Sequence, residues 1–233
     1  MGRFITFRFD DGFIKGARKA AACLHPNAAS FFVVTGLICG SESLDHIGLF
    51  RERDFGSIDE WRALAAEGHD VQLHSATHAN FTAMSMDEQS REIRESLAVI
   101  RRIHAGPYAF CYPYNALTDL DLACYGISAS GFETVASDHA VSFNLLDERL
   151  DMYRLRSWAV RERHFDDILN QLMHDVPEMS WTILAFHSLD DEGHEPWGSE
   201  SFSQLVSAVR GMGYQILSVA AMVNMRILYR VEE

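Results

Sequence analysis

Residues Phe4–Gly12 read FITFRFDDG, an apolar run that ends in two carboxylates and a glycine. The β-rich run predicts a buried strand, and Gly12 predicts a sharp turn directly after it. Two adjacent carboxylates repel each other, so their placement at one site is favourable when a cation lies there. Alternatively, Asp10 and Asp11 form an exposed strand-to-helix turn, in which an aspartate caps the following helix.

The same succession of a β-rich stretch and a helical pattern repeats along the chain. Such alternation predicts parallel β/α units, and about seven units suit a closed or nearly closed barrel better than an open sheet. A chain of 233 residues favours one domain, and no linker or internal repeat divides residues 1–233. Strands are expected at residues 4–9, 29–34, 69–73, 108–112, 127–131, 152–160, 181–186 and 214–217, and helices at 13–24, 57–68, 85–104, 118–125, 164–174 and from 201 onward.

Composition and charge narrow the class of protein. Hydrophobic residues make up 48% and charged residues 23% of the chain, as is typical of a folded globular protein. The net charge of −13 disfavours contact with phosphate backbones or anionic lipid, so we expect no nucleic-acid and no membrane partner. The N-terminal residues enter a strand without the apolar region of a signal peptide, which predicts a cytoplasmic protein. Scattered cysteines without a C-x-x-C pair also suit a reducing compartment: Cys23, Cys39, Cys111 and Cys124.

The candidate functional residues cluster at the predicted strand ends. In parallel β/α barrels the chemistry lies at the C-terminal ends of the strands. Polar and aromatic residues follow several of the predicted strands, and we expect them to share one rim of the barrel. They are Asp10, Asp11, His74, Tyr112, Tyr114, Trp158 and His187.

His74 and His78 are spaced i, i+4, directly after the strand predicted at 69–73. On one helical turn this spacing places both imidazoles on the same face, close enough to share an ion. With one carboxylate they would form a site with open positions for water and substrate, which is typical of catalytic zinc and accepted by other divalent metals. The alternative is a pair of histidines that lie close by chance among the 11 in the chain.

His187 ends the most apolar of the predicted strands, residues 181–186. A histidine at the mouth of a buried strand is well placed to act as a general acid near neutral pH. Taken alone, such a residue is more often a core histidine whose ring nitrogens are hydrogen-bonded.

Several segments together resemble the ordered motifs of the polysaccharide deacetylases, also called the NodB-homology or carbohydrate esterase 4 family. The resemblance covers roughly residues 4–220, with motif order and spacing intact. It implies a distorted (β/α)7 barrel, a divalent metal ion, and hydrolysis of an N-acetyl group from an amino sugar. The segments are Phe9–Gly12, Ala29–Phe32, Gly68–Asp70, His74–His78, Tyr112–Tyr114 and Leu184–His187.

The resemblance also implies a role for each matching residue. Asp11, His74 and His78 would hold the metal, with zinc the first choice and nickel or cobalt as alternatives. Asp10 would be the general base and His187 the general acid. These roles suit the chemistry, because hydrolysis of an acetamide requires an activated water, a stabilised oxyanion and a protonated leaving nitrogen.

The substrate side of the site follows from the same resemblance. Tyr114 would offer its backbone N–H to the oxyanion, while Tyr112 and Trp158 would line the sugar pocket. The expected partner is therefore an N-acetylated sugar or glycan.

The third and fourth motifs depart from the family pattern. Members often carry an arginine just before the Pro-Tyr of the third motif, where it orients the base, but Phe110–Asn115 contains none and has Asn115 where glycine is common. The aspartate before the tryptophan of the fourth motif is absent as well. Either Arg154 or Arg156 replaces the missing arginine from another strand, or both pair only with surface carboxylates.

These residues leave three functions open. The leading one is a metal-dependent deacetylase of a soluble oligosaccharide or a biosynthetic glycan intermediate, because a chain without an export signal is not expected to meet cell-wall polymers. The same scaffold could instead hydrolyse a non-sugar amide, such as a ureide or a cyclic imide. The third is a non-catalytic carbohydrate-binding relative.

Overall fold

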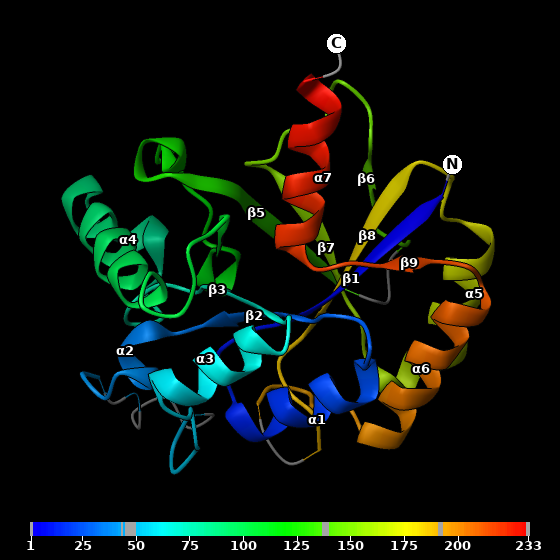
Figure 1. Ribbon diagram of the computed structural model, residues 1–233, viewed down its shortest axis with the longest axis horizontal. Helices are drawn as coiled ribbons and strands as arrows, with labels where there is room; N and C mark the ends of the chain where they lie inside the picture. Colours follow the sequence, from blue (N-terminus) through cyan, green and yellow to red (C-terminus); the bar gives the residue numbers. More distant parts are fainter. Residues whose placement is uncertain (1, 43, 45–49, 137–139, 191–192, 232–233) are drawn as a thin grey trace.

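A closed barrel of parallel strands forms the centre of the computed structural model, which describes residues 2–42, 44, 50–136, 140–190 and 193–231 (Figure 1). Its strands, in spatial order, are β1 (Arg3–Phe9), β2 (Ser30–Val33), β3 (Asp70–Leu73), β4 (Tyr108–Cys111), β5 (Ile127–Ala136), β7 (Leu155–Ala159) and β8 (Ser180–Phe186). β8 pairs with β1 along its whole length, from Arg3↔Ser180 to Phe9↔Phe186, and so closes the ring. The predicted (β/α)7 barrel is confirmed.

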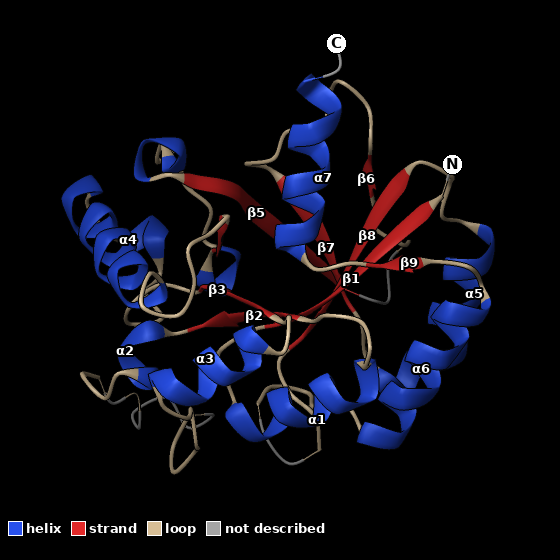
Figure 2. Cartoon of the chain, viewed as in Figure 1, coloured by secondary structure: helices blue, strands red, loops and turns tan. Residues whose placement is uncertain are grey.

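Helices surround the strands on the outside of the barrel (Figure 2). The ranges are α1 (Ile14–Leu24), α2 (Thr35–Ile38), α3 (Ile58–Ala66), α4 (Met86–Ile100), α5 (Phe165–His174), α6 (Ser199–Gly211) and α7 (Val219–Val231). The 3₁₀ turns are η1 (Phe81–Ala83), η2 (Pro113–Asn115), η3 (Leu122–Tyr125) and η4 (Glu162–His164). In the part of the chain that the structure describes, no helix combines the length and apolar character needed to cross a bilayer.

Side chains of β1 alternate between two apolar layers, as the period of two in a strand requires. Ile5, Phe7 and Phe9 belong to the layer between the strands and the helices, whereas Phe4 packs inside the barrel. Arg8 is on the same face of β1 as Phe4 and is buried in the interior. A guanidinium thus reaches the inside of the barrel from an otherwise apolar strand.

Helix α7 closes the end of the barrel opposite the strand C-termini. Its residues Val219 and Met222 pack with Phe4 near the start of β1. The first turn of α7 is capped by buried side chains: the Val219 N–H donates to Ser30 Oγ at 2.8 Å and the Ala220 N–H donates to Asp70 Oδ2 at 3.0 Å. The Gly68–Asp70 motif therefore supports the fold and leaves the other rim free for chemistry.

Two short strands extend the sheet beyond the barrel. β6 (Asn144–Leu145) pairs antiparallel with β8, and β9 (Gln215–Ile216) pairs parallel with β1. β6 was not anticipated, because a two-residue strand carries no periodic signal.

Capping boxes begin the two helices predicted at 57–68 and 85–104. Ser57 with Glu60 and Ser85 with Glu88 form both reciprocal hydrogen bonds. The predicted start at Ser201 is wrong: α6 begins at Ser199 after an N-cap at Gly198, so Ser201 lies within its first turn. There the backbone N–H of Ser199 is satisfied by Asp190, a residue distant from the helix in sequence.

Other boundaries also differ from the sequence-based expectation. Only the 3₁₀ turn η3 forms in the segment predicted as a helix at 118–125. β5 continues to Ala136, five residues beyond the predicted end, because β7 supplies a partner for the extension. Helix α7 had no predicted counterpart, and its Met222 is buried in the core.

Candidate active site

Asp10 and Asp11 lie where β1 ends and turns toward α1. The Asp10 N–H donates to the carbonyl of Phe186 at 3.0 Å, which extends the β1–β8 pairing by one residue. Asp11 then adopts φ 73° and Gly12 φ 92°, and a Cβ on Gly12 would lie 3.1 Å from Cβ of Val33. Glycine suits this turn because an added side chain would meet both strain and a close neighbour. Both carboxylates consequently stay at the barrel rim and are buried.

Asp11, His74 and His78 converge as predicted. Asp11 Oδ1 lies 3.2 Å from His78 Nε2 and 3.5 Å from His74 Nε2, and the two imidazole rings are 5.2 Å apart. Their ligand atoms all lie within 4.8 Å of one another. One carboxylate oxygen and two imidazole nitrogens make a donor set that suits zinc and similar divalent metals.

The histidines do not lie on a helical turn, so that part of the prediction is wrong. The segment after β3 is irregular, and Ser75 and His78 have φ values of 65° and 55°. The positive φ values at Ser75 and His78 reverse the direction of the backbone, and this reversal brings the two imidazole rings together without a helical turn.

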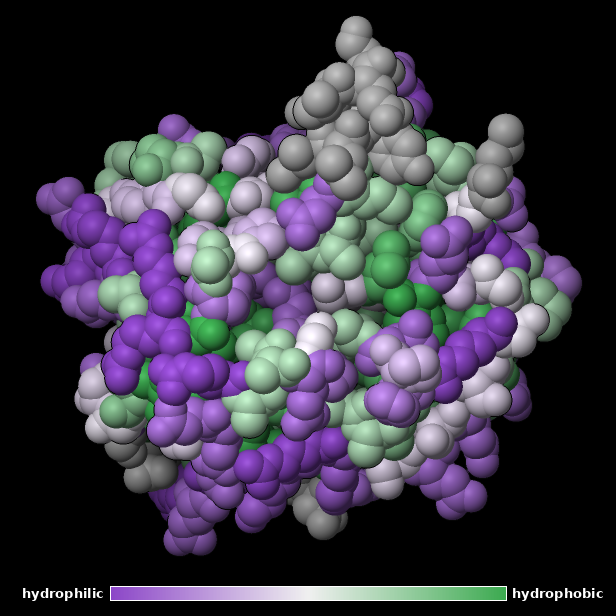
Figure 3. Space-filling view, in the orientation of Figure 1, coloured by the Kyte–Doolittle hydropathy of each residue, from purple (hydrophilic) through white to green (hydrophobic). Residues whose placement is uncertain are grey.

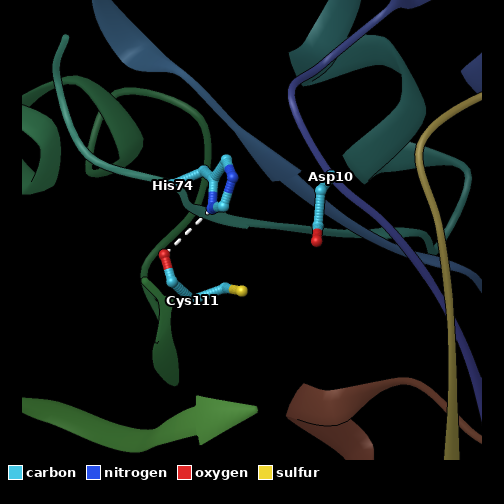
Figure 4. Close-up of side chains that lie close together, drawn as sticks. All are labelled: Asp10, His74 and Cys111. Atoms are coloured by element: carbon cyan, nitrogen blue, oxygen red, sulfur yellow. Dashed lines mark hydrogen bonds between the residues drawn. The ribbon is translucent and has the colours of Figure 1, made fainter. Parts of the chain in front are cut away.

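The His74 ring is oriented by the end of β4. His74 Nδ1 lies 2.9 Å from the carbonyl oxygen of Cys111 (Figure 4). Since a carbonyl only accepts hydrogen bonds, Nδ1 carries a proton and Nε2 faces Asp11. A second possible ligand group contains Asp10, His74 and Cys111, but it shares His74 with the first, and its aspartate already binds Arg8. The Asp11 group therefore fits a metal better.

Asp11 and His74 each stabilise the charged form of the other. Burial disfavours ionisation of Asp11, but hydrogen bonds from His74 and His78 outweigh it and hold the pKa of Asp11 well below its ordinary value. Burial likewise disfavours the charged form of His74, yet the contact with Asp11 raises the pKa of His74 well above its usual range. These opposite shifts favour an Asp11 carboxylate beside a His74 imidazolium.

Metal binding is expected to release about one proton per ion at pH 7, because His74 must lose a proton before Nε2 can coordinate. Affinity should accordingly rise as the pH rises toward the elevated pKa of His74. Calorimetric titration of zinc in buffers of different ionisation enthalpy measures the protons released. Release that persists unchanged in a His74→Ala variant would contradict this assignment.

Glu92 of α4 holds the histidine loop and was missed by the sequence analysis. Its Oε2 accepts hydrogen bonds from the N–H groups of Ala76 (2.9 Å) and Thr77 (3.0 Å), and its Oε1 accepts from Thr77 Oγ1 (2.9 Å). Glu92 is itself buried. A sequence signal did exist, since Glu92 lies on the same helical stripe as the buried Gln89 and Ser96.

Replacing Glu92 by alanine is expected to weaken zinc binding by about 10- to 100-fold, a range typical for the loss of groups that orient metal ligands. The two loop N–H groups would lose their acceptor, and the loop between His74 and His78 would no longer be fixed. Competition with a zinc indicator measures the effect. Glu95→Ala, an exposed glutamate on the same helix, is the matched control and should bind zinc as wild type.

Asp10 is paired with Arg8, which the sequence analysis also missed. Arg8 Nη2 lies 2.7 Å from Asp10 Oδ2, and both side chains are buried. The other Asp10 oxygen, Oδ1, has no hydrogen-bond partner among the described residues, although it too is buried. Arg8 and Asp10 are two residues apart on one strand and so share a face, which was the available signal.

Of the two alternatives for Arg154 and Arg156, the one in which either orients the base is wrong. Arg154 forms an ion pair with Asp119 at 3.1 Å, and both side chains are exposed. Arg156 is exposed on β7 as well, because the inward-facing residue of that strand is its neighbour Ser157. The guanidinium that meets Asp10 comes from β1.

Arg8 is held in turn by the strands on the far side of the barrel. Its Nη1 donates to the carbonyl of Phe132 (3.1 Å) and to Ser157 Oγ (2.9 Å), and its Nη2 donates to Thr134 Oγ1 (3.1 Å). The proximity of Asp10 outweighs the effect of burial and raises the pKa of Arg8. Arg8 is therefore a fixed positive charge beneath Asp10.

A pocket of about 490 Å³ opens above these groups and brings most of the predicted residues together. It is lined by Asp10, Asp11, His74, His78, Tyr112, Tyr114 and His187, and also by Arg8, Asn115, Thr134, Arg161, His194 and Glu195. Trp158 is not among them: it is fully buried in the layer between strands and helices, because alternation along β7 turns Ser157 inward and Trp158 outward. The prediction that Trp158 lines the sugar pocket is wrong, and Ala159 and Val160 line that wall.

His187 and Tyr114 both follow Asp11, His74 and His78 in the chain, and both line the same pocket. Burial lowers the pKa of His187, which favours its neutral imidazole. The ring of His194 lies 5.4 Å from it at 87°, in the loop after β8. Tyr114 has φ 58° and its ring lies 4.6 Å from that of His78.

Comparison with known proteins is decisive for the family. The sequence model described as Polysaccharide deacetylase matches residues 2–132, more than half of the chain. The chain belongs to the polysaccharide deacetylase family. The predicted family and enzyme class, a carbohydrate deacetylase, are confirmed. A search of curated protein sequences found no match.

Solved structures share the fold of this family member at low sequence identity. The Xyl-CE4 domain of a multidomain xylanase from the hindgut metagenome of Trinervitermes trinervoides is 14% identical, with a TM-score of 0.59 and coverage of 97% of this chain and 92% of that chain. The Bc1960 peptidoglycan N-acetylglucosamine deacetylase is 16% identical, with a TM-score of 0.60 and coverage of 93% and 86%. A mutant of BA3943, described as a family pseudoenzyme, is 12% identical, with a TM-score of 0.61 and coverage of 95% and 67%. The barrel alone therefore does not determine activity.

Proposed function

We propose that this deacetylase hydrolyses the N-acetyl group of a small, soluble amino sugar with the help of a divalent metal ion. The observation that carries the proposal is the convergence in one pocket of Asp11, His74 and His78 with the buried Asp10–Arg8 pair. A decayed binding module would have no need for a buried carboxylate whose Oδ1 lacks a partner.

The residues would divide the reaction between them. When bound by Asp11, His74 and His78, a divalent metal supplies a Lewis acid that lowers the pKa of water and polarises the acetyl carbonyl. Asp10 accepts a proton from the attacking water, and Arg8 keeps that carboxylate in place. The water oxygen bonds to the carbonyl carbon, the carbon–nitrogen bond breaks, and acetate and the amine leave.

The other two groups act on the oxyanion and on the leaving group. The Tyr114 N–H donates to the developing oxyanion, which a preorganised donor stabilises most in the transition state. His187 transfers a proton to the departing nitrogen, because an amide anion is too poor a leaving group. Its lowered pKa makes His187 a stronger acid than an ordinary histidine once it is protonated.

The ligand atoms indicate which metal would bind, and the pocket indicates the size of the substrate. We infer zinc first, with nickel and cobalt as alternatives, because one carboxylate and two imidazoles suit all three. A pocket of about 490 Å³ suits a ligand of one or two sugar units. The ion pair of Glu195 with Arg161, 2.7 Å long, stands in its wall and favours a small substrate over a long polymer. A cytoplasmic location remains part of the proposal.

Acetate release from a panel of N-acetylated mono- and disaccharides, with chitin and peptidoglycan beside them, tests the proposal. We expect turnover of a small sugar that stops on chelation and returns with zinc, nickel or cobalt. Turnover of non-sugar amides alone would favour the second function considered from the sequence. Activity that survives complete metal removal would contradict the mechanism.

A further inference from the structure

Asn115 stands where the family commonly has glycine, and its side chain makes an unusual contact with β5. Asn115 Nδ2 donates to the carbonyl of Thr134 at 3.0 Å, and Asn115 Oδ1 accepts from the Thr134 N–H at 3.1 Å. The pairing of β4 with β5 ends at Cys111↔Gly131, so the carboxamide replaces a strand partner for Thr134. Asn115 has φ 53°, a conformation that asparagine tolerates better than most residues.

Thr134 takes part in a second contact through its side chain. Its Oγ1 accepts a hydrogen bond from Arg8 Nη2 at 3.1 Å, and the same Nη2 lies 2.7 Å from Asp10. The backbone of Thr134 thus faces the turn that carries Tyr114, while its hydroxyl faces the charge pair of the base. Thr134 and Asn115 both line the pocket.

We propose that Thr134 links the Arg8–Asp10 pair to the turn that carries Tyr114. Asn115 is the positioning residue that fixes this turn to Thr134. The inference rests on the proposed function, since it assigns Tyr114 and Asp10 the roles given above. Without the carboxamide, the turn would keep its left-handed backbone but lose its attachment to β5. The Tyr114 N–H would then be aimed less accurately at the oxyanion, which a donor must meet at a defined position.

Asn115→Gly tests whether Asn115 fixes the Tyr114 turn to β5. Glycine adopts a positive φ without strain, so this substitution removes the carboxamide and little else. We expect kcat to fall by about 10-fold with KM within about 2-fold, because an oxyanion donor acts in the transition state and not on bound substrate. Hydrogen exchange at residues 113–116, which reports the amides of Tyr114, Asn115 and Ala116 because Pro113 has no N–H, should become faster when measured without substrate or metal.

Asn144 offers a matched control. Its carboxamide makes the same two hydrogen bonds to a strand backbone, with Nδ2 to the Arg156 carbonyl and Oδ1 to the Arg156 N–H, both at 2.9 Å. It does not line the pocket. Asn144→Gly is expected to lower the melting temperature while kcat and exchange at residues 113–116 stay as in wild type.

Thr134→Val and Thr134→Ser test the link between the Thr134 hydroxyl and Arg8. Valine keeps the backbone contact with Asn115 but removes the acceptor for Arg8, so we expect kcat to fall by about 10-fold with exchange at residues 113–116 unchanged. Serine retains a hydroxyl and should restore kcat to within about 2-fold of wild type. If kcat fell in Thr134→Ser as far as in Thr134→Val, the hydroxyl would have no role in holding Arg8, and this link would be overturned.

The outcomes separate this inference from the proposed function. Unchanged exchange at residues 113–116 in Asn115→Gly, or an equal fall of kcat in Asn144→Gly, would overturn the role of Asn115. If wild type released no acetate from any sugar, the proposed function would fail, and the exchange measurement would still decide whether Asn115 fixes the turn.

Discussion

Replacing Asp10 by asparagine should lower kcat by about 1,000-fold, within the range found for removal of a general acid or base. Asparagine has nearly the same shape and still accepts a hydrogen bond from Arg8, but it cannot take a proton from water. Asp10 is not among the proposed metal ligands Asp11, His74 and His78, so the variant should bind one equivalent of zinc as wild type does.

Two measurements on one preparation decide this prediction: zinc content after dialysis, and acetate release from the best sugar. Asp119→Asn is the control, because Asp119 is an exposed aspartate paired with Arg154 on the surface. Loss of zinc together with activity would move Asp10 into the ligand set. If wild type and Asp10→Asn bound a sugar equally well and both turned it over equally slowly, the protein would be a sugar-binding protein and not an enzyme.

Replacing Arg8 by methionine should both inactivate and destabilise the protein. Arg8 is 2% exposed, and its removal leaves the Asp10 carboxylate buried without its positive partner. Breaking a buried ion pair from one side costs about 3–5 kcal/mol of unfolding free energy. Activity should fall as well, because the unpartnered carboxylate would no longer be held at the pocket.

A double-mutant cycle separates the charge pair from the packing. In the Asp10→Asn background, Arg8→Met should cost much less unfolding free energy than in wild type, because no buried carboxylate is left unpaired. Denaturant unfolding measures both. Arg154→Met and Arg156→Met should each change stability by less than about 0.5 kcal/mol, since both arginines are exposed. Equal costs of Arg8→Met in both backgrounds would show that Asp10 is not its partner.

Much of the fold could be predicted from the sequence because its signals are local. The apolar runs that became β1 and β8 are fully buried strands, and their side chains have no alternative that hides so much apolar surface. The capping boxes at Ser57 and Ser85 place helix starts by hydrogen bonds within four residues. Strand and helix alternation then leaves few topologies, and a barrel is among the commonest.

The predicted metal ligands also came together, since all three follow strands that end at the same rim. What failed were inferences that needed a neighbour from elsewhere in the chain. Trp158 was assigned to the pocket by the family resemblance, but it lies within β7, where the alternation of side chains turns it outward. The i, i+4 spacing of His74 and His78 was taken as helical, whereas Glu92 holds an irregular loop.

The sequence by itself determined that parallel strands would alternate with helices, that carboxylates and imidazoles would meet at one rim, and that this rim would carry the chemistry. Only the tertiary structure decided which arginine faces Asp10, what holds the histidine loop, and why asparagine stands at position 115. The reason is physical. Burial patterns and caps depend on residues a few positions apart. The hydrogen bonds that hold Arg8 beside Asp10 depend on how the strands lie around the barrel, which joins residues more than a hundred positions apart, such as Arg8 and Ser157.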